Sequence, residues 1–315
     1  MDITLIKTFM EVAATGSFVS ASDRLFVTQS AVSLRIQRLE DSLGHLLFTR
    51  SKAGAILTPA GQEFERYALS LLKIWEEARA QIAIPEGFSQ TITLGAQYSL
   101  WPRMGFRWID ELQKRLPDLS VRAEVGMPDR LTRFLIEGVI QAGLTYTPQL
   151  RPGLEVDKIM EDELILVASW PDPAPEIDGR YIFIDWGPEF THAHAIGMPH
   201  LANTGLTLAL GSMGADYIVN RRAAAYLPAR SVQRYLDAGR LHLVPDAPRF
   251  SYPVHVVWRD DLDPDIARVA KQSLLHVAQG AEDEQEALLD RLAELSEVHS
   301  VGRLGEDGKG SMSNA

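Results

Sequence analysis

The sequence predicts an α/β protein that opens with a winged helix-turn-helix, continues through one long helix and ends in a larger region of alternating strands and helices. Three observations carry this prediction. Residues 28–44 form a capped helical pattern behind two shorter ones, residues 59–82 hold apolar side chains at helical spacing, and β-rich runs alternate with helical patterns from residue 90. A chain of 315 residues is long enough for two or more domains.

The segment from Thr28 to Gly44 is the most informative part of the sequence. Thr28 can cap its start, because the side-chain oxygen accepts an unpaired backbone N–H, and Gly44 stands where a helix C-cap belongs. Apolar spacings of three and four would seat this helix on a core. They are formed by Ala31, Val32, Leu34, Ile36, Leu39 and Leu43. The hydrogen-bonding side chains off that face suit base edges in a major groove of DNA. They are Gln29, Ser30, Ser33 and Arg35.

Two shorter helical patterns precede this segment. Residues 3–15 carry one apolar stripe that predicts a first helix, which Gly16 can end. Ser17 can cap a second helix over residues 18–25, and a short turn at residues 26–27 leads into the next helix. Helix, short turn, helix is the helix-turn-helix arrangement, in which the second helix of the motif enters the major groove.

A two-stranded wing is predicted after this unit. Residues 46–50 and 55–58 can pair as its strands. Arg50 and Lys52 lie at the wing, where their charges suit contact with phosphate or with the minor groove. Together with Arg38 they are expected to hold the DNA backbone, a role that positions the protein but carries no sequence information.

A set of residues across the first 61 positions matches one known pattern with few gaps. The set is Phe9, Val12, Ser17, Phe18, Ala21, Leu25, residues 28–33, Ile36, Leu39, Glu40, Leu43, Gly44, Leu47, Phe48, Arg50, Leu57, Thr58, Ala60 and Gly61. These residues resemble the signature of the LysR-type transcriptional regulators. The resemblance implies sequence-specific binding to double-stranded DNA, regulation as an activator or a repressor, and no enzymatic activity. A winged helix used only for protein contact is the alternative interpretation.

Composition agrees with this interpretation apart from the net charge. The absence of Cys excludes disulfide and thiol chemistry. No signal peptide opens the chain and no apolar run is long enough to span a bilayer, so we expect a cytoplasmic protein without a membrane partner. The net charge of −11 conflicts with a protein that coats DNA, but residues 1–90 hold nine Lys and Arg against ten Asp and Glu, whereas residues 281–315 hold three against nine. Non-specific DNA binding should therefore be weak and salt-sensitive.

Residues 59–88 are predicted to link the DNA-binding domain of residues 1–58 to the rest of the chain through a helix. Pro59 suits the first helical position, and Pro85-Glu86-Gly87 breaks the helix. Its apolar stripe consists of Phe64, Tyr67, Ala68, Leu71, Leu72, Trp75, Ala78 and Ile82. The stripe can pack on its own domain or pair with the same helix of a second subunit. The LysR resemblance implies the second, with a dimer or homotetramer, and two-fold symmetry would then give a palindromic operator.

Residues 89–280 are expected to form an effector-binding domain. Strands that alternate with helices predict parallel α/β layers. The β-rich runs are residues 91–96, 121–125, 140–146, 164–169, 181–185, 206–210, 224–227 and 254–258. The LysR resemblance implies two α/β lobes in a periplasmic-binding-protein-like fold, with the last strand returning to the first lobe and crossings near residues 160–163 and 252–253.

Ligands of open α/β sheets bind at the carboxyl ends of strands, which nominates residues for an unknown small-molecule effector without any motif. They are Ser99, Leu100, Tyr146, Thr147, Asp185, Trp186, Ser212 and Met213. Ordinary loop and capping roles are the alternative for each of them. No cofactor or metal is expected, and RNA polymerase is a further candidate partner.

Departures from the family pattern argue against a standard effector pose. Gln141 stands where many members have Asp, and Arg221 stands where many have Gly. Arg221 and Arg222 can bind an anion or face solvent. Residues 99–101 and 185–190 resemble the subgroup that contains the H-NS-dependent regulator of the flagellar master operon, which implies repression of a motility operon.

Other interpretations remain open. His192 and His194, with His200 nearby, suggest a metal site on one face of a strand, but nearby carboxylates complete no recognised ligand pattern. A metal-dependent enzyme is therefore a weak alternative, and the P-loop, GxGxxG and GxSxG motifs are absent. A constitutive nucleoid-type DNA-binding protein is another, although it needs no large α/β region. Residues 281–315 are expected to form an acidic tail with an amphipathic helix near residues 286–298, as an interaction helix or a packed end.

Overall fold

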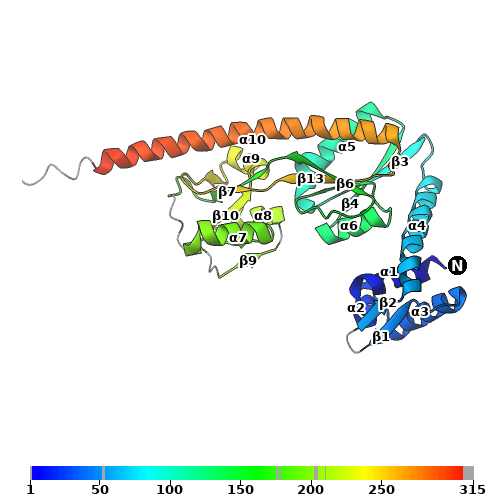
Figure 1. The fold of residues 1–315 in the computed structure, drawn as a ribbon. Helices are drawn as coiled ribbons and strands as arrows, with labels where there is room; N and C mark the ends of the chain where they lie inside the picture. Colours follow the sequence, from blue (N-terminus) through cyan, green and yellow to red (C-terminus); the bar gives the residue numbers. More distant parts are fainter. Residues whose placement is uncertain are drawn as a thin grey trace, which may run out of the picture.

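The structure is a computed structural model that describes residues 2–51, 54–174, 177, 179–201, 205–209 and 211–307, without the side chains of residues 50–51 and 296–307. Figure 1 shows a small helical domain, a helix that leads away from it, and two α/β lobes beneath one long helix. The small domain projects from one end of the molecule, so that most of its surface is open to solvent.

Three helices build the N-terminal domain within described residues 2–51: α1 (Ile3–Thr15), α2 (Phe18–Leu25) and α3 (Gln29–Leu43). Each begins behind a side-chain cap, because oxygens of Asp2, Ser17 and Thr28 accept backbone N–H groups of the first turn. Gly16 and Gly44 end α1 and α3 in the left-handed conformation that favours glycine. The core beneath these helices contains Ile6, Phe9, Val12, Phe18, Ala21, Val32, Ile36 and Leu39.

The wing forms as predicted, from the antiparallel strands β1 (Phe48–Ser51) and β2 (Gly54–Leu57). Glu40 of α3 ties it to the helices, because its Oε1 accepts the N–H of Leu47 at 2.7 Å and that of Phe48 at 3.2 Å. A Cβ at Gly61 would lie 2.2 Å from the carbonyl oxygen of Leu47. Glycine therefore allows the next helix to start directly against the wing.

The linker helix α4 (Pro59–Ile82) carries an apolar stripe that is buried in one part and exposed in another. Ala68 and Leu72 are buried in the core of the N-terminal domain, and the ring of Phe64 lies 5.0 Å from that of Phe9. Tyr67, Ile74, Trp75 and Ile82 of the same helix are exposed, and Trp75 and Ile82 continue the side of Phe64 and Ala68 further along the helix. A groove of about 450 Å³ runs between α4 and α1 beside Trp75. Both predicted uses of the stripe, packing on its own domain and pairing with a second copy, are therefore compatible with one helix.

The first lobe contains a sheet of order β4-β3-β5-β13-β6 among the described residues. Its strands are β3 (Gln90–Ala96), β4 (Leu119–Val125), β5 (Ala142–Thr145), β6 (Leu154–Met160) and β13 (Val254–Arg259). Its helices are η1 (Tyr98–Leu100), η2 (Trp101–Gly105), α5 (Phe106–Arg115) and α6 (Pro128–Ile136). The last strand returns from the second lobe to this sheet, as the family resemblance implies.

The second lobe surrounds the buried strand β7. Its strands are β7 (Glu163–Ala168), β8 (Phe183–Ile184), β9 (Thr207–Leu208), β10 (Ala224–Pro228), β11 (His242–Leu243) and β12 (Phe250–Ser251). Its helices are α7 (Pro188–Gly197), η3 (Pro199–Leu201), η4 (Gly211–Met213), α8 (Gly214–Val219) and α9 (Ala229–Asp237). Tyr226 of β10 is fully buried at the centre of this lobe.

The prediction of parallel layers is right for β4, β3 and β5 and wrong for the rest of the two main sheets. β13 runs antiparallel to β5 and β6, and β10, β11 and β12 all run antiparallel to β7. The two crossings between the lobes explain this for the pairs β6 with β13 and β7 with β12. The chain leaves the first lobe through β6 and enters the second through β7, then returns through β12 and β13. Outgoing and returning strands lie side by side and therefore point in opposite directions.

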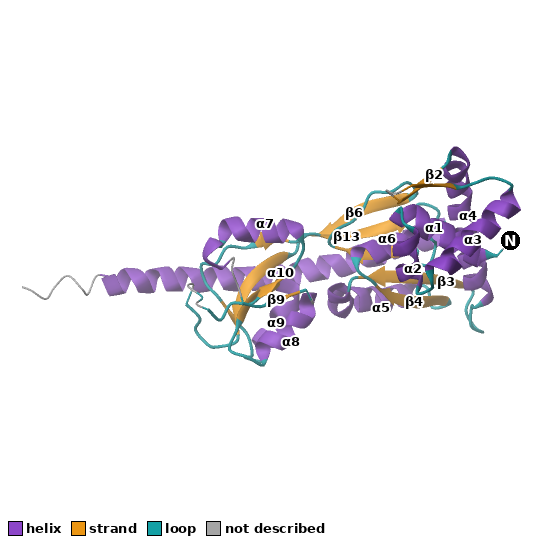
Figure 2. Ribbon diagram, turned by 90° about the horizontal axis from the view of Figure 1, so that it is seen from below, coloured by secondary structure: helices purple, strands orange, loops and turns teal. Residues whose placement is uncertain are grey.

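Helix α10 (Pro264–Asp307) passes over both lobes (Figures 1 and 2). At the first lobe, Trp108 Nε1 donates to the carbonyl oxygen of Ala270 at 3.1 Å. Between the lobes, Gln285 Nε2 donates to the carbonyl oxygen of Glu161 at 2.7 Å. Leu288 is buried further along the helix. The predicted boundary at residue 280 thus falls inside a continuous helix.

Among the described residues, no helix is both long and apolar enough to cross a membrane.

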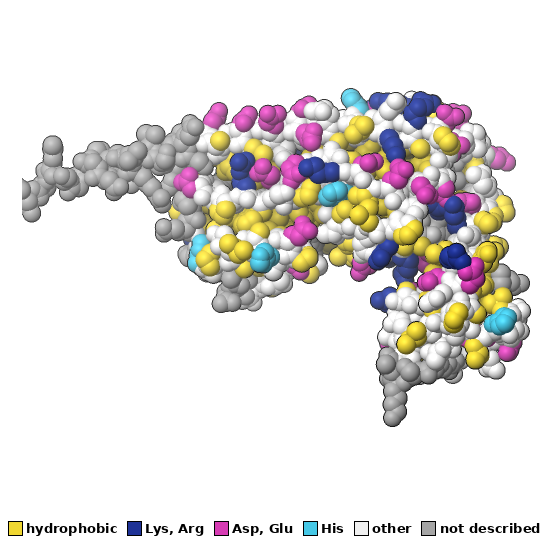
Figure 3. Space-filling view, in the orientation of Figure 1, with side chains coloured by type: hydrophobic (Ala, Val, Ile, Leu, Met, Phe, Trp, Pro, Cys, Tyr) yellow, Lys and Arg dark blue, Asp and Glu magenta, His cyan; other side chains and the backbone are white. Residues whose placement is uncertain are grey.

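Ion pairs attach the N-terminal domain and α4 to the first lobe. Glu11 of α1 lies 3.0 Å from Arg133 of α6, and Glu77 of α4 lies 3.2 Å from Arg259 of β13. On the face shown in Figure 3, Lys and Arg side chains gather at this junction, whereas Asp and Glu side chains follow α10. The acidic side chains of α10 that the structure describes therefore lie away from the wing and α3.

Candidate functional site

The first functional surface is the solvent side of α3. Gln29 and Ser30 stand in its first turn and are exposed, and Ser33 lies half-buried one turn later. The hydroxyls of Thr28 and Ser30 are 3.0 Å apart, and that of Thr28 also accepts the N–H of Ala31. The helix thus presents short hydrogen-bonding side chains at its start, which is the end that contacts base edges in helix-turn-helix complexes.

Other residues of α3 differ from the prediction. Leu34 is 49% exposed and Leu43 is also exposed, so neither seats the helix on the core. The structure does not support Arg35 as a base reader, because its guanidinium turns toward α1 and donates to Thr8 Oγ1 at 3.4 Å. Arg38 is exposed and remains available for a phosphate.

The predicted contacts from the wing cannot be placed. Lys52 lies outside the described residues, as does the side chain of Arg50. The backbone of Arg50 pairs with Ala55 in the hairpin. Their assignment to the DNA backbone therefore stays a prediction that rests on charge and on position in the wing.

The second candidate site lies between the lobes. The chain crosses at residues 161–162 and again at residues 252–253, where the crossings were predicted. The N–H of Tyr252 donates to the carbonyl oxygen of Asp162 at 2.7 Å, which holds the two crossings together. Any change in the angle between the lobes must therefore bend these two crossing segments.

Arg230, in the first turn of α9, links the crossing to the first lobe. Its Nε lies 2.6 Å from Asp162 Oδ2, its Nη1 donates to the carbonyl oxygen of Ser99 at 3.1 Å, and its Nη2 donates to the hydroxyl of Tyr146. The side chains of Arg230 and Asp162 are 2% and 0% exposed. Burial lowers the pKa of Arg230 to about 10, which leaves it charged at neutral pH. Burial raises the pKa of Asp162, and hydrogen bonds from the backbone of Glu163 and Arg230 oppose this effect.

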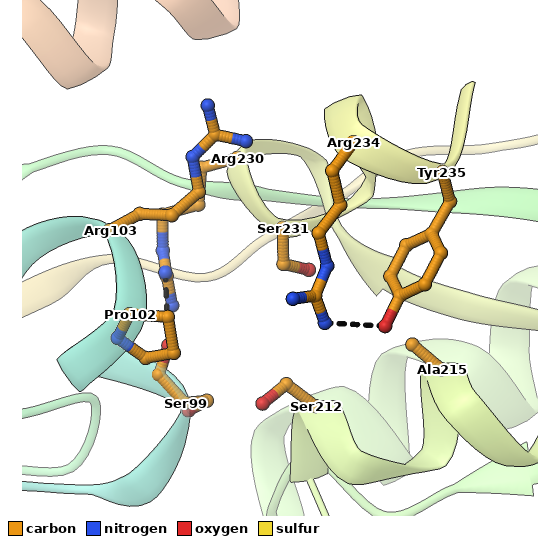
Figure 4. Close-up of a pocket in the computed structure, with 9 residues that line it drawn as sticks. All are labelled: Ser99, Pro102, Arg103, Ser212, Ala215, Arg230, Ser231, Arg234 and Tyr235. Carbon is orange, nitrogen blue, oxygen red and sulfur yellow. Dashed lines mark hydrogen bonds between the residues drawn. The ribbon is translucent and has the colours of Figure 1, made fainter. Parts of the chain in front are cut away.

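A cavity of about 50 Å³ opens beside Arg230, between η2 of the first lobe and α8 and α9 of the second (Figure 4). Its lining residues are Ser99, Pro102, Arg103, Ser212, Ala215, Arg230, Ser231, Arg234 and Tyr235. Figure 4 shows Arg234 and Tyr235 descending from α9, with a hydrogen bond between them. Both lobes therefore supply polar side chains to one small space.

Two of the eight nominated effector residues line this cavity. Ser99 belongs to the first lobe and Ser212 to the second. Leu100 and Trp186 are buried in the core instead, and Trp186 Nε1 donates to the carbonyl oxygen of Tyr226 at 2.9 Å. The prediction that Leu100 and Trp186 contact an effector is therefore corrected, because both side chains pack in the core.

The other four nominated residues lie around the cleft without lining the cavity. Tyr146 is buried and stacks on Tyr252, with ring centroids 3.8 Å apart. Thr147 is half-buried, and Met213 is exposed. Asp185 is exposed beside a separate hollow at the start of α7. Position at a strand end was therefore a weak criterion for which side chains meet.

Sequence reasoning missed the arginines of α9. Arg230 and Arg234 follow Leu227 and Pro228, which end a buried strand. Their position just after the end of a buried strand was the sequence signal that could have identified them. Arg221 and Arg222, for which the sequence predicted either anion binding or exposure to solvent, are exposed in the structure.

The histidine pair does not form a metal site. His192 and His194 lie on helix α7 rather than on a strand, so they do not share a face. His194 is buried and its Nε2 lies 2.8 Å from the hydroxyl of Tyr181. Within the described residues no cluster of three or more His, Cys, Asp or Glu could hold a metal ion.

The burial of His194 predicts a pH-dependent stability of the second lobe. Burial lowers its pKa below 6.5, so the unfolded chain takes up a proton before the folded one as pH falls. The free energy of unfolding should therefore decrease as pH falls from 6.5 toward the lowered pKa. Denaturant unfolding between pH 7.5 and 5.5 should show a smaller decrease for His194→Gln than for the wild type. Equal slopes of unfolding free energy against pH for His194→Gln and the wild type would contradict this assignment. His255→Gln is the matched comparison and should also show a smaller decrease than the wild type, because burial also lowers the pKa of His255.

A capped reading helix, a linker helix with a partly exposed apolar stripe and two lobes around a polar cavity define a DNA-binding regulator with a ligand-binding domain. Residues 3–62 match the family described as bacterial regulatory helix-turn-helix protein, lysR family, and residues 85–278 match the LysR substrate binding domain. The chain belongs to the LysR family of transcriptional regulators. Members of this family are regulators rather than enzymes, as predicted.

Curated relatives support the same assignment. The HTH-type transcriptional regulator HdfR of Salmonella schwarzengrund is 31% identical over 273 residues, which cover 84% of this chain and 94% of that relative. HdfR of Yersinia enterocolitica is 29% identical over 294 residues, with 89% and 99% covered. The subgroup expected from residues 99–101 and 185–190 is thus present among the relatives.

Solved structures confirm the fold. A full-length OxyR variant from Pseudomonas aeruginosa has a TM-score of 0.54 at 21% identity and covers 87% of this chain and 98% of its own. ArgP from Mycobacterium tuberculosis has a TM-score of 0.54 at 23% identity, with 89% and 98% covered. Full-length LysG from Corynebacterium glutamicum with bound effector Arg has a TM-score of 0.52 at 18% identity, with 89% and 99% covered.

Proposed function

We propose that two copies of this chain read a palindromic operator through α3, and that a small molecule bound between the lobes changes this activity. The observation that carries the proposal is the exposed first turn of α3, where Gln29 and Ser30 stand on a helix whose other face is fixed in a core. Gln29, Ser30 and Ser33 are the proposed base readers, and Thr28 positions the helix start. Arg38, Arg50 and Lys52 are the proposed backbone contacts.

The proposed dimer forms through α4. Its exposed residues Tyr67, Ile74 and Trp75 recur at spacings that place them along one side of the helix. An apolar stripe of this length on a helix is typical of a surface that is buried in an assembly. An isologous pairing of α4 would relate two reading helices by a two-fold axis, and a palindromic site follows from that symmetry. Further pairing to a tetramer and contact with RNA polymerase stay predictions.

The proposed effector response uses the space between the lobes. Arg230 contacts the crossing through Asp162 and the first lobe through Ser99 and Tyr146, so a ligand at this guanidinium would act on both lobes at once. The LysG relative holds its effector, arginine, in a structure of the same fold. A ligand changes the population of two states only by its difference in affinity for them, and contacts from both lobes supply such a difference.

Footprinting of the full-length protein across genomic DNA at physiological salt tests the DNA-binding part of this proposal. Discrete palindromic sites are expected, with a motility operon as one predicted target. Diffuse, salt-labile protection without a shared sequence would instead favour the nucleoid-type alternative. Footprinting can separate discrete from diffuse protection, because the nearly neutral charge of the N-terminal region limits non-specific binding to DNA.

Two substitutions separate base reading from backbone contact. Gln29→Ala is expected to weaken operator binding by about 1–3 kcal/mol and to relax specificity at one base position. Arg38→Ala should weaken all sequences alike and reduce the slope of affinity against salt. Binding to a library of operator variants measures both effects, with Gln113→Ala of the first lobe as the matched control. A uniform loss in both variants would contradict the division between the two roles.

A further inference from the structure

We infer that the cavity between η2, α8 and α9 binds the oxyanion group of a small ligand, with Arg234 at its mouth and Arg230 on its floor. This inference rests on the proposed effector response and names the chemistry of the ligand. It also places the ligand on the helix side of the cleft, away from most of the strand ends that sequence reasoning nominated.

The polar lining of the cavity consists of hydrogen-bond donors. Arginine and serine side chains supply it from both lobes, together with Tyr235 of the second lobe, and no carboxylate is among the residues that line it. The hydroxyls of Ser99 and Ser212 make no hydrogen bond to another described residue and are free to donate into the space. A donor-lined space with arginines is the arrangement that selects carboxylate or phosphate oxygens over neutral groups.

Carboxylates near the cavity stand behind its lining and are already used. Asp162 pairs with Arg230, and Glu284 of α10 pairs with Arg103 at 3.0 Å. Glu284 also pairs with Arg107 at 2.9 Å, so it does not fully neutralise Arg103. Arg103 lies close enough to Arg230 to add to the lowering of its pKa, after burial. An anion between these guanidinium groups would relieve their repulsion.

Among the arginines that line the cavity, Arg234 is the one whose hydrogen-bond donors are least used by the described carboxylates. Its guanidinium lies over the ring of Tyr235 and donates to the hydroxyl of that residue, and no ion pair joins it to a described carboxylate. The Tyr235 hydroxyl in turn donates to Asp216 Oδ1 at 2.6 Å, which orients the tyrosine and leaves further N–H groups of Arg234 unused. Arg234 is exposed and therefore meets a ligand as it enters.

The size of the cavity limits what it can hold. A space of about 50 Å³ accepts a few water-sized groups, since one water needs roughly 10–15 Å³ on this measure. One carboxylate or phosphate group fits such a space and an aromatic ring does not. A larger effector would place its charged end inside and leave the remainder at the mouth, beside Arg234.

Titration calorimetry of the full-length protein with inorganic phosphate, acetate and succinate, each at constant ionic strength, tests the inference. At least one of these anions is expected to bind, and Arg234→Gln should weaken that binding about tenfold or more, because a charged hydrogen bond is lost. Phosphate binding alone would identify a phosphate-bearing ligand, and carboxylate binding alone an organic acid. Ser212→Ala provides a second variant with a smaller expected loss. Arg222→Gln is the matched control, because Arg222 is exposed outside the cavity.

Two outcomes would overturn the inference. One is the absence of anion binding at millimolar concentration, and the other is binding that Arg234→Gln and Arg222→Gln affect equally. Footprinting of the wild type in the absence of anion distinguishes failure of the oxyanion inference from failure of the proposed DNA-binding function. Discrete operator sites without anion binding would leave the proposed regulator intact and remove only the oxyanion assignment.

Discussion

Asp162→Asn is expected to lower the free energy of unfolding of the effector domain by about 3–5 kcal/mol. The substitution keeps the shape of the side chain but leaves the Arg230 guanidinium charged, 2% exposed and without its carboxylate. The burial that lowers the pKa of Arg230 to about 10 shows how unfavourable that charge is in this position. Denaturant unfolding at pH 7, followed by tryptophan fluorescence, measures the difference.

A double variant provides the control for this effect. Asp162→Leu with Arg230→Met replaces the ion pair by apolar side chains of similar volume, which often costs little stability. We expect it to recover most of the loss seen in Asp162→Asn while abolishing any response to anions at the cleft. An Asp162→Asn protein as stable as the wild type would show that the pair does not hold the crossing as the structure indicates.

Trp75→Glu is expected to weaken the proposed dimer by about 4 kcal/mol, or roughly a thousandfold in its dissociation constant. Trp75 lies on the exposed stripe of α4, and an isologous interface contains it twice, at about 2 kcal/mol for each aromatic anchor. Operator affinity should fall with the dimer, because a monomer contacts one half-site. Sedimentation velocity and operator binding on the same samples measure the two effects.

Ile196→Glu is the matched control for the dimer. Ile196 is an exposed apolar residue on α7 of the second lobe, far along the chain from the linker helix. The same charge at this position should leave both the dimer and operator binding unchanged. Trp75→Glu protein that remains dimeric would show that another surface carries the assembly.

The N-terminal domain could be derived closely from the sequence because its information is local. Capping residues, glycine ends and apolar spacings specify each helix within a few turns, and the structure begins and ends α1 and α3 at the expected positions. The exceptions are Leu34, which is apolar but exposed, and Arg35, which turns to Thr8. Which way a side chain turns depends on its neighbours in space rather than on its spacing.

The effector domain was less predictable because its features are not local. Alternating strands and helices indicated parallel α/β layers, but strand direction depends on which strands meet after the chain crosses and returns. The acidic tail was expected to begin at residue 281, yet Gln285 binds a carbonyl at the crossing and Leu288 is buried. Periodicity shows that a helix is amphipathic and does not show what its apolar face covers.

The sequence by itself determined the helices of the N-terminal domain, including the reading helix, since short patterns of caps, turns and apolar spacing encode them. The class of the protein and its two-lobed ligand-binding domain followed from the resemblance of its motifs to those of the LysR-type regulators. Only the tertiary structure decided which residues meet between the lobes. Arg230 is separated by 68 positions from Asp162 and by 131 from Ser99, yet it contacts both. Contacts at such separations arise from the crossing of the chain and from packing, and no local pattern carries them.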